Sequence, residues 1–146
     1  MNFEEYAKAA ARTSDPSRPL VINTLYAACG LVGEWAEWLE VETVEEAGDV
    51  AWHLAEIARV WELGTLQPRA DKRHPSPVHH LGVISEASKK WACHGQPREI
   101  FADAVRSSAE SLLWVLVARH NMPEVYAHNI AKLRERHPGK FDTSYH

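Results

Sequence analysis

Hydrophobic positions recur every three or four residues along most of the chain, which is the period of an amphipathic α-helix. The longest such run follows Pro19, a residue suited to the first turn of a helix, and its apolar positions are Leu20, Leu25, Ala28, Leu31, Trp35, Trp38 and Leu39. A second run extends from Ala47 to Trp61. It is preceded by Thr43 and Glu46, which have the spacing of an N-terminal capping box. The pattern therefore predicts two long helices joined by a very tight turn, which makes them antiparallel.

The rest of the chain is also predicted to be helical. Asn2 and Glu5 form a capping-box start for a first helix, and Asn121 and Glu124 form one for the last. With these starts, the other predicted helices span about residues 2–12, 78–91, 98–120 and 121–136. Strand-like alternation of useful length is absent. We therefore expect an all-α fold, a bundle of helices with short antiparallel connections.

The length of 146 residues fits one domain, residues 1–146. Residues 65–78 contain three prolines and mixed charge, so we expect a linker there between residues 1–64 and 79–146. The two parts share a pattern: GLVGEWAEW from Gly30 aligns with GVISEASKKW from Gly82, and EEAGDVAWHL aligns with SSAESLLWVL. We interpret them as two related helical hairpins in one chain. Chance similarity between amphipathic helices is the alternative.

The composition of the chain limits which binding partners and which cellular compartment we expect. The formal net charge of −4 gives no overall attraction to nucleic acid, so nucleic-acid binding is not expected. No apolar run approaches the roughly 20 residues needed to span a bilayer, so we expect no membrane segment. Two cysteines are too few for a disulfide framework. A reduced, cytoplasmic location is the expectation.

Carboxylates gather on the two central helices. Glu34 and Glu37 are three residues apart and so are neighbours on one helix face, and Glu46 and Asp49 repeat the spacing on the next helix. Antiparallel helices bring the two pairs to face each other, and two bare carboxylates 4 Å apart repel by about 4 kcal/mol at an effective dielectric constant of ~20. A divalent cation removes this repulsion, and oxygen ligands favour Mg²⁺, Mn²⁺ or Ca²⁺ over Zn²⁺.

The alternative interpretation is a solvated acidic face. Such a face normally interleaves lysine or arginine with the acids. The chain has neither between Arg18 and Arg59, which favours a cation site.

The motif Gly-Glu-x-x-Glu followed by Glu-x-Gly-Asp-Val-x-Trp resembles the MazG-type all-α nucleoside triphosphate pyrophosphohydrolases. The ending NIAKLRERHPGKF, residues 129–141, is similar to the tail of phage-like members, and the resemblance covers about residues 24–141. It implies the helical bundle of that family and hydrolysis of a nucleoside triphosphate to the monophosphate and pyrophosphate. It also implies that Mg²⁺, or alternatively Mn²⁺, is bound by Glu34, Glu37, Glu46 and Asp49. Glu37 or Glu46 is expected to orient or deprotonate the attacking water.

The resemblance also implies a substrate site. Asn129 and Lys132 match tail positions that lie close to the nucleotide in relatives, and Lys90 and His53 complete the predicted substrate-binding set. Two features depart from the family pattern. The gap between Glu37 and Glu46 is short, and the Lys-Lys-Trp and His-Gly pieces of the usual inter-helix segment occur only in the second half.

The second half lacks the ligand set of the first. Glu86 aligns with Glu34, but Lys89 replaces Glu37, and Ser108 and Ser111 replace Glu46 and Asp49. We therefore expect a degenerate half without a metal site of its own. That half either supplies the packing of a second subunit, as an intramolecular pseudo-dimer, or leaves the chain to form a homodimer.

Two other functions remain open from the sequence. One is a non-catalytic helical module that binds a nucleotide or a protein partner. The other is a pyrophosphatase of related fold that acts on a phosphoribosyl-nucleotide.

Overall fold

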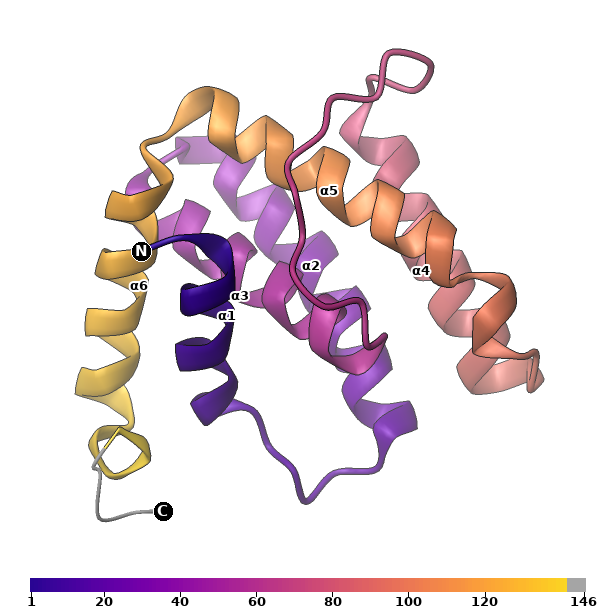
Figure 1. Cartoon of the computed structure of the whole chain (residues 1–146), viewed down its shortest axis with the longest axis horizontal. Helices are drawn as coiled ribbons and strands as arrows, with labels where there is room; N and C mark the ends of the chain where they lie inside the picture. The colour runs from indigo at the N-terminus through magenta and orange to yellow at the C-terminus, as the bar shows by residue number, and fades with distance from the viewer. Residues whose placement is uncertain (142–146) are drawn as a thin grey trace.

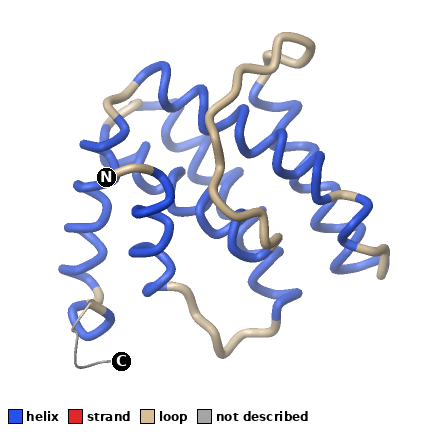
Figure 2. Tube along the Cα trace, viewed as in Figure 1, coloured by secondary structure: helices blue, strands red, loops and turns tan. Residues whose placement is uncertain are grey.

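The computed structural model describes residues 1–141, and these residues form helices connected by turns and loops, with no strand among them (Figures 1 and 2). The six α-helices are α1 (Phe3–Ala10), α2 (Leu20–Val41), α3 (Val44–Val60), α4 (Pro77–His94), α5 (Ala102–Arg119) and α6 (Met122–Arg136). Three short 3₁₀ turns are η1 (Ala11–Thr13), η2 (Arg98–Ile100) and η3 (Pro138–Lys140). The all-α prediction is confirmed. None of the described helices is both long and apolar enough to cross a membrane.

The predicted helix starts follow from side-chain caps. The Asn2 side chain accepts a hydrogen bond from the Glu5 backbone N–H at 2.9 Å, and the Glu5 carboxylate accepts one from the Asn2 N–H. Thr43 Oγ1 accepts from the Glu46 N–H at 3.2 Å at the start of α3. Each bond satisfies a backbone donor that has no partner inside the helix, so the helices begin within a residue or two of the predicted positions.

The turn between α2 and α3 is as tight as predicted. Only Glu42 and Thr43 separate the two helices, and Glu42 adopts a left-handed conformation with φ of 45°. A non-glycine residue rarely adopts this conformation. The strained residue reverses the chain, and α3 folds back along α2.

Helix α3 lies at the centre of the bundle. It packs against α1, α2, α5 and α6, whereas α2 packs mainly against α3 and α4, and α4 against α5 (Figure 1). Trp35 and Trp38 of α2, Leu54 and Ile57 of α3 and Leu112 of α5 are among the largest fully buried side chains. Two residues of the predicted α2 core stripe are instead exposed: Leu20 at 43% and Leu39 at 52%.

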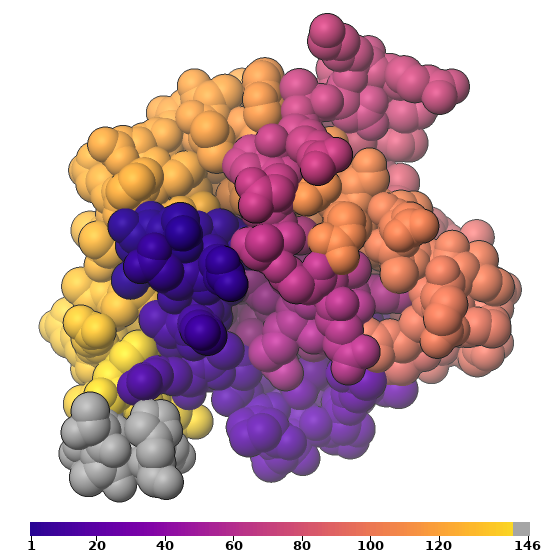
Figure 3. Space-filling model, viewed as in Figure 1, coloured from indigo at the N-terminus to yellow at the C-terminus, as the bar shows by residue number. Residues whose placement is uncertain are grey.

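The predicted linker is held against the bundle. Figure 3 shows residues 61–76 crossing the surface between the α1 side and the α4–α5 side. Leu66 is buried, and the Gln67 N–H donates to the Glu110 side chain at 2.7 Å. The Arg69 N–H donates to the Glu110 carbonyl at 3.2 Å. The segment therefore belongs to the packed structure although it has no regular helix.

Candidate metal and nucleotide site

Three of the four predicted carboxylates come together where α2 and α3 face each other. Glu34 comes from α2, and Glu46 and Asp49 come from neighbouring turns of α3. One carboxylate oxygen from each lies within 4.8 Å of the other two. The tight turn at Glu42 and Thr43 produces this arrangement because it places the last turns of α2 against the first turns of α3.

Glu37 lies outside this group of three. Its side chain is exposed, but its charge raises the pKa of both Glu34 and Glu46. It is therefore a neighbour of the cluster rather than one of the converging ligands.

The cluster is short of positive charge and of hydrogen-bond donors. Burial, followed by the charges of Asp49 and Glu37, raises the pKa of Glu34 to about 7. Burial and Asp49 also raise the pKa of Glu46. The Oε2 atoms of Glu34 and Glu46 are both buried without a hydrogen-bond partner. Since buried carboxylate oxygens without a partner are costly, a donor set of three carboxylates with two unsatisfied oxygens fits a hard divalent cation.

Lys132 of α6 supplies one positive charge. Its ammonium group donates to Asp49 Oδ1 at 2.8 Å and lies 3.4 Å from Glu45 Oε1. Burial lowers the pKa of Lys132, but the hydrogen bond to Asp49 and the charge of Asp49 outweigh it, so that the pKa is raised. One ammonium group against three carboxylates leaves negative charge to be balanced.

A cavity of about 310 Å³ opens beside the carboxylates. It is lined by Thr13, Arg18, Tyr26, Glu34, Asp49, Trp52, His53, Asn129, Lys132, Leu133, Arg136 and His137. The lining includes the carboxylates of Glu34 and Asp49 and the cationic groups of Arg18, Lys132 and Arg136. Such a cavity can accept the phosphates of a ligand through its cationic groups, and its carboxylates would hold a metal ion.

Asn129 lies in the wall of this cavity and is held rigidly. It is 2% exposed, and its Oδ1 accepts a hydrogen bond from the Tyr6 hydroxyl at 2.7 Å. It also packs against Gly48, where an added Cβ would lie 3.0 Å from the Asn129 Cβ and Nδ2. Gly48, inside the acidic motif, therefore lets α6 approach α3 closely enough to bring Asn129 and Lys132 to the site.

His53 forms another part of the wall. It is 7% exposed, its Nδ1 is buried without a hydrogen-bond partner, and burial lowers its pKa. The ring occupies the space above Gly30, where an added Cβ would lie 2.1 Å from Cε1. The neighbouring Trp52 is fixed by a hydrogen bond from its indole N–H to Thr13 Oγ1 at 2.8 Å.

The structure brings together most of the predicted substrate residues. Asn129, Lys132 and His53 all line the cavity, whereas Lys90 lies on α4 and is not part of its lining. Sequence reasoning missed Arg18 and Tyr26, whose guanidinium and ring stack at 4.4 Å. The sequence contains one signal for Arg18: it is the last lysine or arginine before the long acidic stretch.

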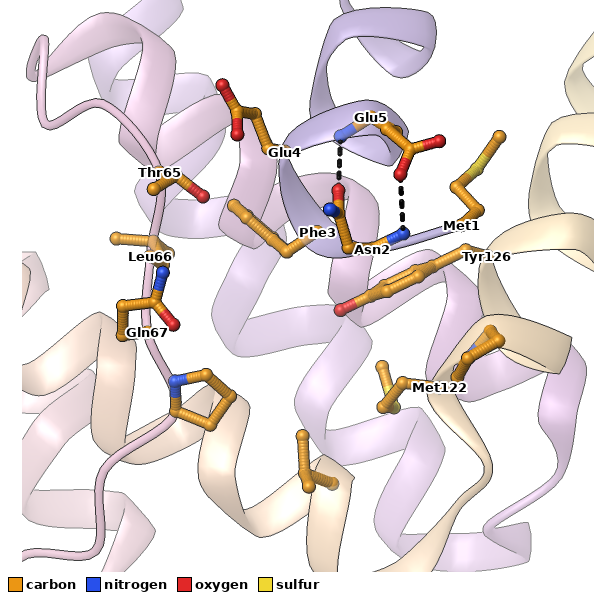
Figure 4. Close-up of a pocket in the computed structure, with 13 residues that line it drawn as sticks. Met1, Asn2, Phe3, Glu4, Glu5, Thr65, Leu66, Gln67, Met122 and Tyr126 are labelled. Atoms are coloured by element: carbon orange, nitrogen blue, oxygen red, sulfur yellow. Dashed lines mark hydrogen bonds between the residues drawn. The ribbon is translucent and has the colours of Figure 1, made fainter.

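A larger cavity of about 620 Å³ lies elsewhere, between the start of α1, the linker and the start of α6 (Figure 4). Phe3, Leu66 and Tyr126 give it apolar walls, and the Glu5 carboxylate on its rim is engaged in the α1 cap. None of the predicted site residues lines it. Of the predicted site residues, Glu34, Asp49, His53, Asn129 and Lys132 instead line the smaller cavity.

Comparison with known proteins gave no relative: no family model, no curated protein and no solved structure matches this chain.

Proposed function

We propose that the protein hydrolyses a nucleoside triphosphate to the monophosphate and pyrophosphate in a magnesium-dependent reaction, as an enzyme of the MazG type. The observation that carries the proposal is the convergence of Glu34, Glu46 and Asp49 within 4.8 Å beside a cavity with cationic walls. A cytoplasmic enzyme whose second helical hairpin is a degenerate copy of the first fits this proposal.

The three converging carboxylates would hold the ion. When bound, magnesium supplies charge neutralisation at phosphate oxygens and lowers the pKa of water at the site. Manganese has the same ligand preference and is the alternative.

The protein's own groups bind and orient the substrate. Arg18, Lys132 and Arg136 are placed to bind phosphate oxygens and to stabilise negative charge on the departing pyrophosphate. The Trp52 ring and the Tyr26 ring give the cavity aromatic walls that exclude water. Positioning and electrostatics account for most of the catalysis expected in phosphoryl transfer.

A carboxylate must also accept a proton from the attacking water. Glu37 is favoured for this role over Glu46, because Glu46 belongs to the converging set and Glu37 stands next to it with an exposed side chain. A proton acceptor beside the ligands, rather than among them, keeps its basicity for the water.

The test is a pyrophosphate-release assay on the full chain. The substrates are the canonical and modified nucleoside triphosphates and a phosphoribosyl-nucleotide, each with Mg²⁺ or Mn²⁺. We expect pyrophosphate from at least one triphosphate, no release in EDTA, and a loss of about 100-fold or more in Asp49→Asn, as for removal of a strong electrostatic contributor. Release from the phosphoribosyl-nucleotide alone would instead identify the related pyrophosphatase.

The non-catalytic alternative has one observation in its favour. Lys132 already neutralises Asp49 at 2.8 Å, an arrangement that can hold a phosphate without turnover. Calorimetry on the same substrate panel separates the two functions, since saturable binding with no pyrophosphate release from any compound would overturn the catalytic proposal.

A further inference from the structure

The larger cavity, of about 620 Å³, is separate from the candidate metal and nucleotide site, because no residue lines both cavities. It lies between the start of α1, the linker and the start of α6 (Figure 4). Its volume is within the range of small-molecule sites, which combine mostly apolar walls with a few well-placed polar groups. The residues that line it therefore indicate which kind of molecule it can bind.

The inner walls of this cavity are apolar and held in place. The buried residues of its lining are Phe3, Leu66, Met122 and Tyr126. The Tyr126 ring stacks on the Tyr6 ring, with 4.5 Å between the ring centroids, and it meets the Phe3 ring edge to face at 6.3 Å. Because this packing fixes the rings before any ligand arrives, the cavity offers preformed aromatic walls.

The hydroxyl group of Tyr126 points into the cavity without a hydrogen-bond partner. Figure 4 shows it directed into the space bounded by Phe3, Leu66 and Met122, and it donates to no other described residue. Tyr126 is only 3% exposed, and polar groups of buried residues normally have a partner. Burial raises the pKa of Tyr126 to about 12, so the hydroxyl keeps its proton at neutral pH and can donate it. A ligand atom that accepts a hydrogen bond would supply the partner.

The charge at the rim of the cavity disfavours an anionic ligand. Glu4 and Glu5 line the cavity, and no lysine, arginine or histidine of the described chain does so. An anionic group would therefore be repelled by two carboxylates and would find no cationic side chain to bind. The acceptor that fits the Tyr126 hydroxyl is consequently an uncharged one, such as a carbonyl oxygen.

We propose that the larger cavity binds a small, uncharged aromatic molecule that carries a carbonyl group. The aromatic part of the ligand packs against Phe3 and Leu66, and its carbonyl oxygen accepts a hydrogen bond from the Tyr126 hydroxyl. This site stands independently of the catalytic proposal, because it uses neither the carboxylates nor the cationic groups of the smaller cavity.

The first test compares an uncharged probe with an anionic one. Acetophenone is a neutral aromatic ketone, and benzoate is an anion of similar size. Each is titrated into isotope-labelled full-length protein, and shifts of the backbone amide signals of Phe3, Leu66 and Tyr126 report binding at the cavity. We expect saturable shifts with acetophenone and weaker binding of benzoate. An absence of shifts with acetophenone, or tighter binding of benzoate, would overturn the proposal.

Tyr126→Phe tests the hydrogen bond, because it removes the donor and keeps the ring. The second probe is isopropylbenzene, which has nearly the shape of acetophenone but no carbonyl oxygen. We expect the variant to bind acetophenone about 3- to 10-fold more weakly than the wild type does, as for the loss of one hydrogen bond. Its affinity for isopropylbenzene should be unchanged. The same change for both compounds, or no change for either, contradicts the assigned role of the hydroxyl and with it the proposal.

Val117→Trp tests the location without removing a buried group. Val117 is 41% exposed and lines the cavity, so a larger side chain there should block the site at little cost to the fold. We expect this variant to lose acetophenone binding. Val78→Trp is the matched control, because Val78 is 73% exposed on α4 outside the cavity, and it should bind as the wild type does. Acetophenone binding that survives Val117→Trp, or that is lost equally in both variants, would overturn the proposal.

Discussion

The α2–α3 pair and the α4–α5 pair differ in whether their polar side chains have hydrogen-bond and ion-pair partners. In α2–α3, the carboxylates of Glu34, Glu46 and Asp49 crowd together. At the aligned positions of α4–α5, Glu86 is exposed and accepts a hydrogen bond from Lys89 at 3.0 Å. Ser108 lies 3.0 Å from the Nδ1 atom of His80. The α2–α3 pair therefore has buried carboxylate oxygens without a hydrogen-bond partner. In the α4–α5 pair, Glu86 and Ser108 each have a partner on α4.

A second aligned position shows the same contrast. Gly48 of α3 leaves room for Asn129 of α6 at the cavity wall. The aligned residue of α5 is Glu110, which is buried and binds the linker through the Gln67 N–H. Since unsatisfied buried charge costs free energy and satisfied polar groups contribute packing and order, the first pair has the properties of a ligand site and the second those of a scaffold.

The sharpest way to break this comparison is to remove the equivalent glutamate from each pair. If the first pair holds the ion, Glu34→Gln should lower magnesium-dependent pyrophosphate release by about 100-fold or more, because it removes a charged ligand beside the phosphates. Glu86→Gln should leave the rate unchanged, because its carboxylate contacts only Lys89 among the described residues. The measurements are turnover and the rise in melting temperature on adding Mg²⁺. Equal losses in both variants would contradict the assignment of the site to α2–α3.

A pair of aligned glycines gives the next largest effect. Gly30→Ala inserts a methyl group where the His53 ring lies, 2.1 Å from Cε1, so the ring must move and the cavity wall with it. Overpacking of this kind costs about 1–3 kcal/mol. Gly82→Ala meets nothing within 4 Å in α4 and replaces a poor helix former, so it should stabilise the protein by about 0.4–1 kcal/mol.

Urea unfolding of the two alanine variants and the wild type measures these free energies. Opposite signs support the view that the first pair is built closely around its site. Destabilisation by Gly82→Ala, or tolerance of Gly30→Ala, would contradict it.

The sequence predicted the elements better than the surroundings of the site. Helix starts at Asn2, Thr43 and Asn121 were correct because their caps are local, made within three residues along the chain. The exception is the segment predicted as one helix over 98–120. Residues 98–100 form η2 and α5 begins only at Ala102, a boundary that the hydrophobic period does not mark.

The acidic convergence was also predictable, since two motifs on two antiparallel helices fix which faces meet. The rest of the cavity depends on distant packing. Arg18 reaches the cavity from the loop before α2, and Tyr6 fixes Asn129 across 123 residues of sequence. Spacing along the chain contains no signal for such contacts. The sequence also predicted Glu37 and Glu34 equally as metal ligands. The three-residue spacing places both on one face of α2 but does not show that Glu34 faces α3 and that Glu37 is exposed beside it.

The last expected effect is a fall in stability with rising pH, which we expect from the α2–α3 pair and not from the α4–α5 pair. The folded protein holds the Glu34 proton up to a pKa of about 7, whereas the unfolded chain releases it near 4.5. The folded state therefore binds more protons between these values, and the free energy of unfolding of the metal-free protein should fall as the pH rises from about 4.5 to about 7. Glu34→Gln should make this fall smaller, and the remaining part belongs to Glu46, whose pKa is also raised. Glu86→Gln should leave the fall in place. The hydrogen bond from Lys89 lowers the pKa of Glu86, so this group makes stability rise with pH rather than fall.

Thermal melts in EDTA at pH 5 and pH 8 measure the change in stability. Adding Mg²⁺ at pH 8 should restore stability in the wild type but not in Glu34→Gln. The contrary result is a wild-type stability that rises with pH across this window and does not respond to Mg²⁺. It would show that the three carboxylates do not destabilise the fold and that an ion does not stabilise it.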